Sequence, residues 1–250
     1  MQVSPISWME WLGALVKTKA FKTLELLDSE LIKCKRCPRL VEWRQDVAIT
    51  KRKSYQNEDY WGKAVPGFGD LKPKLLIVGL APGAHGANRT GRIFTGDSSG
   101  DWLYGSLHRI GIAKLPTSRS RDDGQKLKRT RITCAVHCAP PDNKPSNEER
   151  DTCASWLQTE LMLVLPTTRS FVALGKFAFE ALIKNLRLIG HVIPTTKFGH
   201  GVEVKYHHQG VNYLIVCSYH PSQQNTFTGK LTESMLDKAL RRAASFVNLA

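Results

Sequence analysis

The stretch from Lys74 to Asp101 constrains the fold of this chain more than any other. Leu75 to Leu80 is a continuous apolar run, which is typical of a strand buried on both faces of a parallel sheet. Pro82-Gly83 ends the run, and the long loop that follows carries glycines at positions 83, 86, 91, 96 and 100. Loops of this kind are uncommon in compact domains unless they are functional. Ligands bind beyond the carboxyl ends of strands in open α/β sheets, so we expect a binding site here rather than an ordinary surface loop.

The remaining sequence alternates between strand and helix patterns. Further strands are predicted over Ile132–Val136, Ser170–Leu174, Val202–Tyr206 and Val211–Ser218. Helices are predicted over Ile6–Ile32, Trp102–Ile110, Lys176–Leu186 and Thr232–Val247, with another that begins near Asn147 as its cap. This alternation predicts a doubly wound α/β fold. No repeat or low-complexity segment divides the chain, so residues 1–250 are predicted to form a single domain.

The charge balance predicts a polyanionic partner. The chain has 36 Lys and Arg against 22 Asp and Glu, a net charge of +14. Nucleic acid is the first candidate for such a partner and an anionic membrane surface the second. No apolar run approaches the roughly 18 residues of a membrane span. The N-terminus lacks the order of a signal peptide, so we expect an intracellular, cytoplasmic protein.

Four of the six cysteines are spaced like metal ligands. Cys34 and Cys37 form a CxxC pair, and no strand pattern precedes it, which argues against a thioredoxin-type redox motif. Cys138 and Cys153 are the best candidates for two further ligands. Four thiolates suit either zinc or an iron–sulfur cluster, and the spacing does not choose between them. Unligated thiols are the remaining alternative.

Two segments concentrate basic residues. Residues 38–70 combine basic side chains with Trp and Tyr, a mixture that suits either a nucleic-acid interface or a solvated face. A second, strongly basic loop follows the predicted helix Trp102–Ile110; its basic residues are Arg119, Arg121, Lys126, Lys128, Arg129 and Arg131.

Four side chains are candidates for chemistry at the predicted sheet edge. Phe94 and Asp97 lie in the glycine-rich loop. Asn143 follows the second strand, and His220 follows the last one. Pro221 restricts the backbone of His220, so the imidazole can be held in place. A structural histidine is the alternative.

Five short motifs carry a resemblance to a known family. They are Gly79-Leu-Ala-Pro-Gly83, Gly91-Arg-Ile-Phe-Thr-Gly-Asp97, Cys138-Ala-Pro-Pro, Ala173-Leu-Gly175 and His220-Pro-Ser222. Together they resemble the motif series of the uracil-DNA glycosylase superfamily, and the four cysteines point to its iron–sulfur branches. The residues of the first two motifs, with Leu80 after Gly79, resemble those of the type-5 family.

The resemblance implies a fold, a cofactor and an activity. The fold would be a three-layer α/β/α sandwich with a mainly parallel four- to five-stranded central sheet. A structural 4Fe-4S cluster would bind the four spaced cysteines and tie in an N-terminal helical region, residues 1–37. The activity would be hydrolysis of the N-glycosidic bond of uracil, and of other deaminated bases such as hypoxanthine, in DNA without strand cleavage. We expect a monomer.

The chemistry of base excision suggests a role for each candidate residue. A base inside a duplex must be flipped into a pocket, where Phe94 can stack on it for about 1–3 kcal/mol. Breaking the bond puts negative charge on the base, which a donor from His220 stabilises, and positive charge on the sugar, which Asp97 stabilises while it orients a water. Asn143 is assigned to the base or the water. The backbone expected to bond the base edge belongs to Leu80, Ala81 and Gly86.

Contacts to the DNA itself follow from the resemblance. Gln223–Leu231 resembles the family's DNA-inserting loop, and Phe227 or Leu231 would wedge into the space that the flipped nucleotide leaves. The residues expected to contact phosphates are Lys230, Arg89 and Arg92.

Two departures from related branches bear on specificity. Leu80 replaces an acidic residue, which shifts the activation of water to Asp97. Cys134 matches an asparagine that reads uracil in the type-4 branch, and a thiol cannot make the same pair of hydrogen bonds, so we expect wider substrate tolerance. The competing hypotheses are a non-catalytic module that binds a base and a zinc protein that acts on nucleotides.

Overall fold

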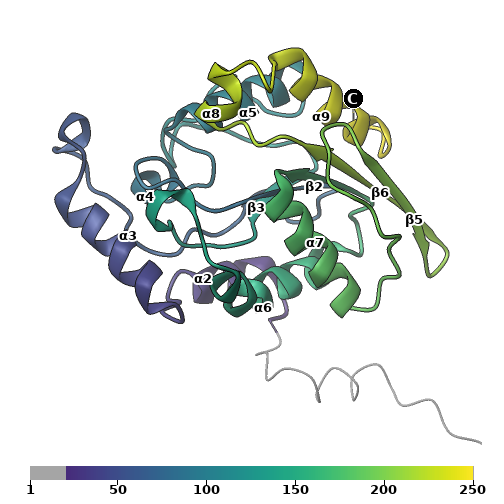
Figure 1. The fold of residues 1–250 in the computed structure, drawn as a ribbon, viewed down its shortest axis with the longest axis horizontal. Helices are drawn as coiled ribbons and strands as arrows, with labels where there is room; N and C mark the ends of the chain where they lie inside the picture. Colours follow the sequence, from purple (N-terminus) through teal and green to yellow (C-terminus); the bar gives the residue numbers. More distant parts are fainter. Residues whose placement is uncertain (1–20, 250) are drawn as a thin grey trace, which may run out of the picture.

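The computed structural model describes residues 21–249 as three layers around one sheet (Figure 1). The predicted helix Ile6–Ile32 lies partly outside the described residues; within them, helix α2 spans Leu24–Leu31. The other helices are α3 (Pro38–Thr50), α4 (Ala87–Thr90), α5 (Ser98–Arg109), α6 (Asn147–Val164), α7 (Lys176–Leu188), α8 (Gln223–Phe227) and α9 (Glu233–Ser245), with short 3-10 turns η1 (Lys53–Tyr55) and η2 (Pro141–Asn143).

The sheet is mainly parallel, as predicted, and has one more strand than expected. Its strands are β1 (Phe68–Gly69), β2 (Leu75–Gly79), β3 (Thr130–Cys134), β4 (Ser170–Leu174), β5 (Glu203–His208) and β6 (Val211–Ser218). They run in the order β1-β3-β2-β4-β6-β5, in which β1 and β5 are antiparallel edges. The additional strand β1 has only two residues, too few for an alternating pattern to reveal it.

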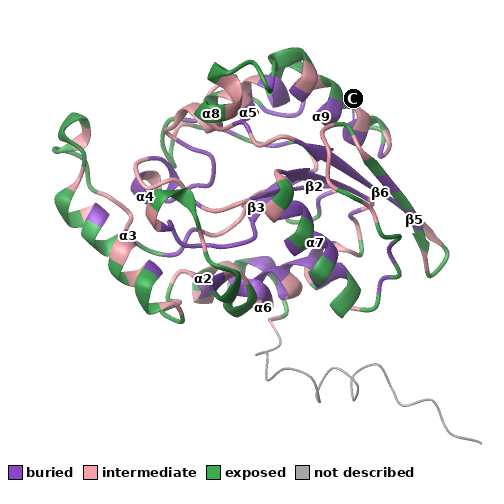
Figure 2. Cartoon of the chain, viewed as in Figure 1, coloured by how far each residue is buried: buried purple, intermediate pink, exposed green. Residues whose placement is uncertain are grey.

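The two faces of β2 are buried under different helices, which makes the three layers. Leu76 and Val78 pack in a core with α2, α6 and α7, while Leu75 and Ile77 pack in a core with α5 and α9. Successive residues of a strand point to opposite faces, so one apolar run supplies both cores. Figure 2 shows the central strands as buried and the outer faces of the helices as exposed.

Several element boundaries differ from the sequence predictions. Helix α3 occupies part of the basic segment 38–70, which showed no clear helical period. Helix α5 begins at Ser98 rather than Trp102 because Asp97 caps it. Helix α6 is capped by Ser146, not Asn147: the Ser146 hydroxyl accepts from the backbone N–H of Glu149, whose carboxylate accepts from the backbone N–H of Ser146. Such a reciprocal capping box satisfies two otherwise unpaired donors.

A buried ionic network fastens α2 to the sheet. The guanidinium of Arg131, 1% exposed in β3, donates to Glu160 of α6 at 2.5 Å and to both carboxylate oxygens of Asp28 at 2.9 and 2.8 Å. The Thr133 hydroxyl donates to the other oxygen of Glu160 at 2.5 Å. Loss of one partner from such a network leaves an uncompensated buried charge.

We expect Arg131→Met to lower the free energy of unfolding by about 3–5 kcal/mol, because it leaves the buried Glu160 and the partly exposed Asp28 without their cation. The matched control is Arg242→Met, which removes a surface pair with Glu203 and is expected to cost less than about 1 kcal/mol. Urea denaturation measures both values, and equal losses in the two variants would contradict the assignment.

Candidate active site

The carboxyl ends of four parallel strands bring the motif segments together. Strands β2, β3, β4 and β6 run in the same direction in neighbouring positions, so the segments that follow them gather at one edge of the sheet. These segments contain residues 80–97, 135–143, 175 and 219–222. The predicted convergence of the first loop and His220 is therefore present in the fold.

Phe94 and His220 lie side by side at this edge. Their ring centroids are 5.8 Å apart with a tilt of 31°. Phe94 is buried and has a positive φ of 51°, and its ring covers the end of β2: a Cβ at Gly79 would lie 2.7 Å from the ring and 3.1 Å from the Cys134 sulfur. Glycine at position 79 therefore allows the aromatic ring to approach the backbone closely.

Asp97 lies directly under the first turn of the loop. One carboxylate oxygen accepts from the backbone N–H of Gly100 at 2.9 Å and so caps α5. The other faces Gly83 and Gly86, where an added Cβ would lie 2.8 and 1.9 Å from it. Burial raises the pKa of Asp97, and the hydrogen bond from Gly100 partly offsets the rise. The loop glycines thus make room for a carboxylate.

His220 is electrically neutral at neutral pH. Its desolvated surroundings lower its pKa to about 4, because the charged imidazolium loses more hydration than the neutral ring. The backbone carbonyl of His220 accepts from the Asn225 side chain at 2.9 Å, which holds the segment after β6. A neutral imidazole still offers one N–H donor.

The backbone predicted to bind a base edge is partly engaged within the protein. The Leu80 carbonyl accepts from the N–H of Val136 at 3.1 Å. The Gly86 carbonyl accepts from the N–H groups of Arg89 and Thr90 as α4 begins. Ala81 is partly exposed between them. Asn143 is exposed in the turn after the double proline, with a φ of 55°.

Arg89 and Arg92 are buried, which corrects their predicted role as phosphate contacts. Arg89 is 8% exposed and pairs with Glu58 and the Gly96 carbonyl. Arg92 is 5% exposed and donates to Asp123 at 2.5 Å. Guanidinium groups bound inside the protein do not reach a DNA backbone, so both arginines are structural here.

The segment predicted to insert into DNA contains a short helix. Phe227, at the end of α8, is 78% exposed, whereas Leu231 is 1% exposed in the core with α5 and α9. Of the two predicted wedges, only Phe227 has the necessary exposure. Lys230 is also exposed, with its ammonium 4.9 Å from the centre of the Tyr219 ring.

The four spaced cysteines share one small cavity between α2, α3 and α6. Cys34, Cys37, Cys138 and Cys153 all line it. Burial raises the pKa of Cys138 to about 11, and Arg44 opposes this rise; burial also raises the pKa of Cys153. Buried thiols of this kind form thiolates only when a metal centre or cation stabilises the charge.

A buried arginine supplies positive charge beside these thiols. Arg44, in α3, is 2% exposed. It donates to the Cys138 sulfur at 2.8 Å and to the Cys34 carbonyl at 2.9 Å. An anionic thiolate centre fits this donor set, since hydrogen bonds to sulfur stabilise such centres. Within residues 21–249, no three His, Cys, Asp or Glu side chains are grouped closely enough to hold a single metal ion.

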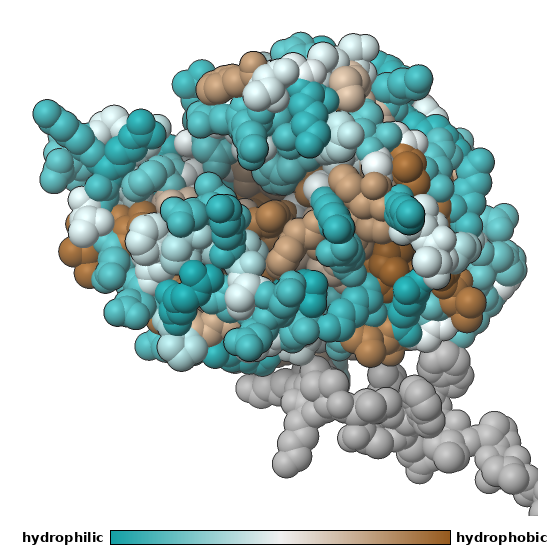
Figure 3. Space-filling model, viewed as in Figure 1, coloured by the Kyte–Doolittle hydropathy of each residue, from teal (hydrophilic) through white to brown (hydrophobic). Residues whose placement is uncertain are grey.

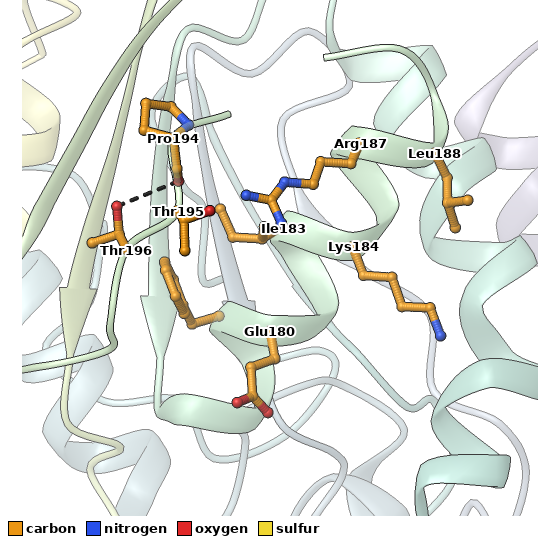
Figure 4. Close-up of a pocket in the computed structure, with 9 residues that line it drawn as sticks. Glu180, Ile183, Lys184, Arg187, Leu188, Pro194, Thr195 and Thr196 are labelled. Carbon is orange, nitrogen blue, oxygen red and sulfur yellow. Dashed lines mark hydrogen bonds between the residues drawn. The ribbon is translucent and has the colours of Figure 1, made fainter. Parts of the chain in front are cut away.

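Another hollow lies away from the motif segments, between α7 and the 194–196 segment. Figure 4 shows Glu180, Lys184 and Arg187 around it, and none of its lining residues belongs to a motif. The rest of the face in Figure 3 is largely hydrophilic, with scattered hydrophobic residues. None of the described helices is both long and apolar enough to cross a bilayer.

Comparison with known proteins decides the family. The family model "Uracil DNA glycosylase superfamily" matches residues 66–244. A type-5 uracil-DNA glycosylase of Mycobacterium leprae is 50% identical over 224 residues, which cover 89% of this chain and 95% of the relative. The chain belongs to the type-5 branch of the uracil-DNA glycosylase superfamily.

Other members of the superfamily support this placement. The type-5 enzyme of Thermus thermophilus is 46% identical over 219 residues, or 88% of this chain and 96% of that protein. A type-4 enzyme of Pyrobaculum aerophilum is only 31% identical over 164 residues, or 65% of this chain and 74% of that protein. The family and enzyme class predicted from the motifs are therefore confirmed.

The sequence analysis did not identify two residues that form buried polar contacts near the candidate site, Arg44 and Asp123. Arg44 lies in a helix whose charged residues suggested a surface, and Asp123 is the only carboxylate that Arg92 pairs with among the described residues. Arg44 and its partner Cys138 are 94 residues apart in the sequence, and Arg92 and its partner Asp123 are 31 residues apart. Leu40, Arg44 and Val47 are all buried in α3, but the local sequence does not distinguish a buried arginine from an exposed one.

We expect Gly86→Ala to destabilise the protein, because the new Cβ would overlap the Asp97 carboxylate. Overpacking of this kind costs about 1–3 kcal/mol. The matched control is Gly105→Ala within α5, where the nearest atom to the Cβ would be 3.4 Å away and where alanine is favoured by about 0.5–1 kcal/mol. Thermal and urea unfolding measure both; a Gly86→Ala protein as stable as the unsubstituted one would show that the loop is not packed as described.

Proposed function

We propose that this chain is a monofunctional DNA glycosylase, which excises uracil from DNA and leaves the phosphodiester backbone intact. The observation that carries the proposal is the contact between Phe94 and His220 beyond the carboxyl ends of the parallel strands, with Asp97 in the same glycine-rich loop as Phe94. Membership of the type-5 branch supports the same activity. The proposed partner is DNA with deaminated bases.

Base recognition begins with a flipped nucleotide, since the bond to be cleaved is out of reach inside a duplex. The Phe94 ring, held close to Gly79, is proposed as the surface on which the base stacks. Phe227 is exposed on α8 and supplies the proposed wedge that occupies the vacated space. Lys230 supplies a nearby cation for a phosphate.

Cleavage of the glycosidic bond separates charge, and two side chains match the two charges. The leaving base becomes anionic, and the neutral His220 ring can donate a hydrogen bond to its oxygen. The sugar becomes cationic, and the Asp97 carboxylate can stabilise it and orient the attacking water. Leu80 provides no carboxylate, so Asp97 carries this role without a second acid. Asn143 is proposed to assist at the base or the water.

Substrate tolerance is proposed to depend on the side chain beside Phe94 and Gly79. Cys134 is 1% exposed, and its sulfur lies near the position of a Gly79 Cβ, beside Phe94. A thiol is a weak donor and a weak acceptor, so it discriminates poorly between base edges. We therefore propose that hypoxanthine is excised as well as uracil.

The proposed cofactor is a 4Fe-4S cluster on Cys34, Cys37, Cys138 and Cys153. Each cysteine binds a different iron in such a cluster, so the thiols need not meet around one point. The shared cavity and the hydrogen bond from Arg44 to Cys138 support this assignment. The cluster would supply structural cross-linking, by joining the segment between α2 and α3 to the β3–α6 region. The steps assigned to Asp97 and His220 do not use it.

Labelled duplexes that contain uracil or hypoxanthine, treated with alkali after incubation, test the activity. We expect strand breaks with both bases, and a drop of at least about a hundredfold in the single-turnover rate for Asp97→Asn, a loss comparable to removal of one stabilising group. DNA binding by Asp97→Asn should persist. A protein that binds the duplexes without cleavable product would be a binding module instead, and strict dependence on uracil would contradict the proposed tolerance.

The rate should also depend on pH through Asp97. The reactive form is the carboxylate, so activity falls as the pH drops through the folded-state pKa. Burial raises this pKa above that of an exposed aspartate, about 3.9, and the acid limb of the single-turnover rate should lie correspondingly higher. The residual rate of Asp97→Asn should lack this limb; an identical limb in the variant would assign it to another group.

Removal of one proposed ligand tests the cofactor. We expect the purified protein to be brown and to contain iron and acid-labile sulfide, and Cys153→Ala to lose both the visible absorption and the iron. Cys217→Ala is the control, because Cys217 is equally buried but lies in β6 and does not line the shared cavity. Colourless protein that contains zinc would overturn the cluster assignment.

A further inference from the structure

The buried Arg92 organises the strongly basic loop that follows α5. Its guanidinium donates to the Ser118 hydroxyl at 2.6 Å, to Asp123 at 2.5 Å and to the Arg121 carbonyl at 3.1 Å. The Asp123 carboxylate also accepts from the backbone N–H groups of Arg119 and Gln125 at 2.8 and 2.9 Å. Residues 118–125 are therefore folded around the buried guanidinium of Arg92. Backbone groups of the loop itself make several of the hydrogen bonds that fix its conformation.

This arrangement turns two other arginines outward. Arg119 and Arg121 are exposed, although the neighbouring side chains of Ser118 and Asp123 are bound to Arg92. The Arg121 guanidinium lies 4.5 Å from the centre of the Trp61 ring, and the ammonium of Lys63, also exposed, lies 5.2 Å from the same centre. Within residues 21–249, no ion pair with a carboxylate is found for any of these three cations.

The three cations lie beside the candidate active site. The Ser118 carbonyl accepts from the N–H of Gly96, the residue before Asp97, at 2.9 Å. Trp61 donates its backbone N–H to the Arg89 carbonyl and packs against Gly91. Arg119 lies near the first turn of α5, where its charge partly offsets the rise that burial causes in the pKa of Asp101. The surface they form is thus attached to the glycine-rich loop on both sides.

We propose that Lys63 and Arg121, which lie over the Trp61 ring, and the nearby Arg119 form a binding surface for the phosphate backbone of duplex DNA next to the flipped nucleotide. This rests on the proposed function. An arginine stacked on an aromatic ring is already ordered, so it loses less conformational freedom when it binds a phosphate. Arg92, first expected to touch DNA, acts instead as a positioning residue that presents this surface.

The chemistry favours DNA over a membrane as the partner. Unpaired cations at the rim of a base-sized site match the regular charges of a nucleic-acid backbone, whose counterions they release on binding. The surface offers one aromatic ring, partly covered by its own cations, rather than the exposed apolar face that an interfacial membrane contact uses. Two exposed carboxylates lie near these cations, Asp122 within the loop and Asp101 near Arg119, and the three cations outweigh them.

The test compares two triple variants of the full-length protein that lose the same charge. One is Lys63→Gln, Arg119→Gln, Arg121→Gln; the control is Lys176→Gln, Lys184→Gln, Lys205→Gln, on α7 and β5. Affinity for an undamaged duplex is measured by fluorescence anisotropy across a salt series. For the loop variant we expect the slope of log K against log salt to become shallower by about 2–3, with at least tenfold weaker binding at about 0.1 M salt.

The control variant should retain the slope of the unsubstituted protein. Equal losses in both variants would assign binding to overall charge and overturn the proposal, as would a loop variant that binds normally. A loop variant that keeps DNA affinity but loses binding to phosphatidylserine vesicles would assign the surface to membranes and overturn it too. The control variant should also keep the single-turnover excision rate of the unsubstituted protein.

This design separates the surface from the activity. Because the duplex is undamaged, the binding result does not depend on base excision. A protein that excises no uracil but loses affinity only in the loop variant would leave the surface standing and refute the proposed function. Normal excision of uracil, together with an unchanged salt slope in the loop variant, would support the proposed function and refute the surface.

Discussion

The close approach of side chains to bare backbone at the end of β2 is the constraint on which the candidate site depends. The Phe94 ring lies close to Gly79, and Asp97 fills the space beside Gly83 and Gly86. A side chain at any of these glycines would displace one of the two groups that the proposed chemistry needs. The same carboxylate caps α5, so the start of that helix and the position of the acid are set by one contact.

Buried arginines connect the rest of the molecule to this site. Arg131 joins α2, β3 and α6, Arg44 joins α3 to the thiol cavity, and Arg92 shapes the basic loop beside the glycine-rich loop. Arg92 and Arg131 are paired with carboxylates, so their burial leaves most of the net charge of +14 to the remaining side chains. Each buried cation has fixed polar partners, which is the condition under which a charge can leave water.

The segment after β3 serves two centres at once. Cys134, at the end of the strand, lies near Gly79 and Phe94, while Cys138, four residues later, lies beside Arg44 and lines the same cavity as the other three thiols. The proposed cluster would thus restrain the backbone that follows β3 at the candidate site. This explains in physical terms how a centre with no part in the bond cleavage can still matter for the site.

The sequence by itself determined the α/β fold, the family, the sheet edge at which the site lies and the four grouped cysteines. These follow from local patterns. A continuous apolar run predicts a buried strand, and the short glycine-rich motifs can be recognised from adjacent residues alone. Asp97, Phe94 and His220 were found this way because each directly follows a strand or lies in the loop after one.

Only the tertiary structure decided which charged and apolar side chains face water. Arg89, Arg92 and Leu231 were expected at the DNA surface and are buried, whereas Phe227 is exposed. Their local sequence looks the same in either case. The difference arises from partners such as Glu58 and Asp123, 31 residues away along the chain, and a pairing over that distance exists only once the chain has folded.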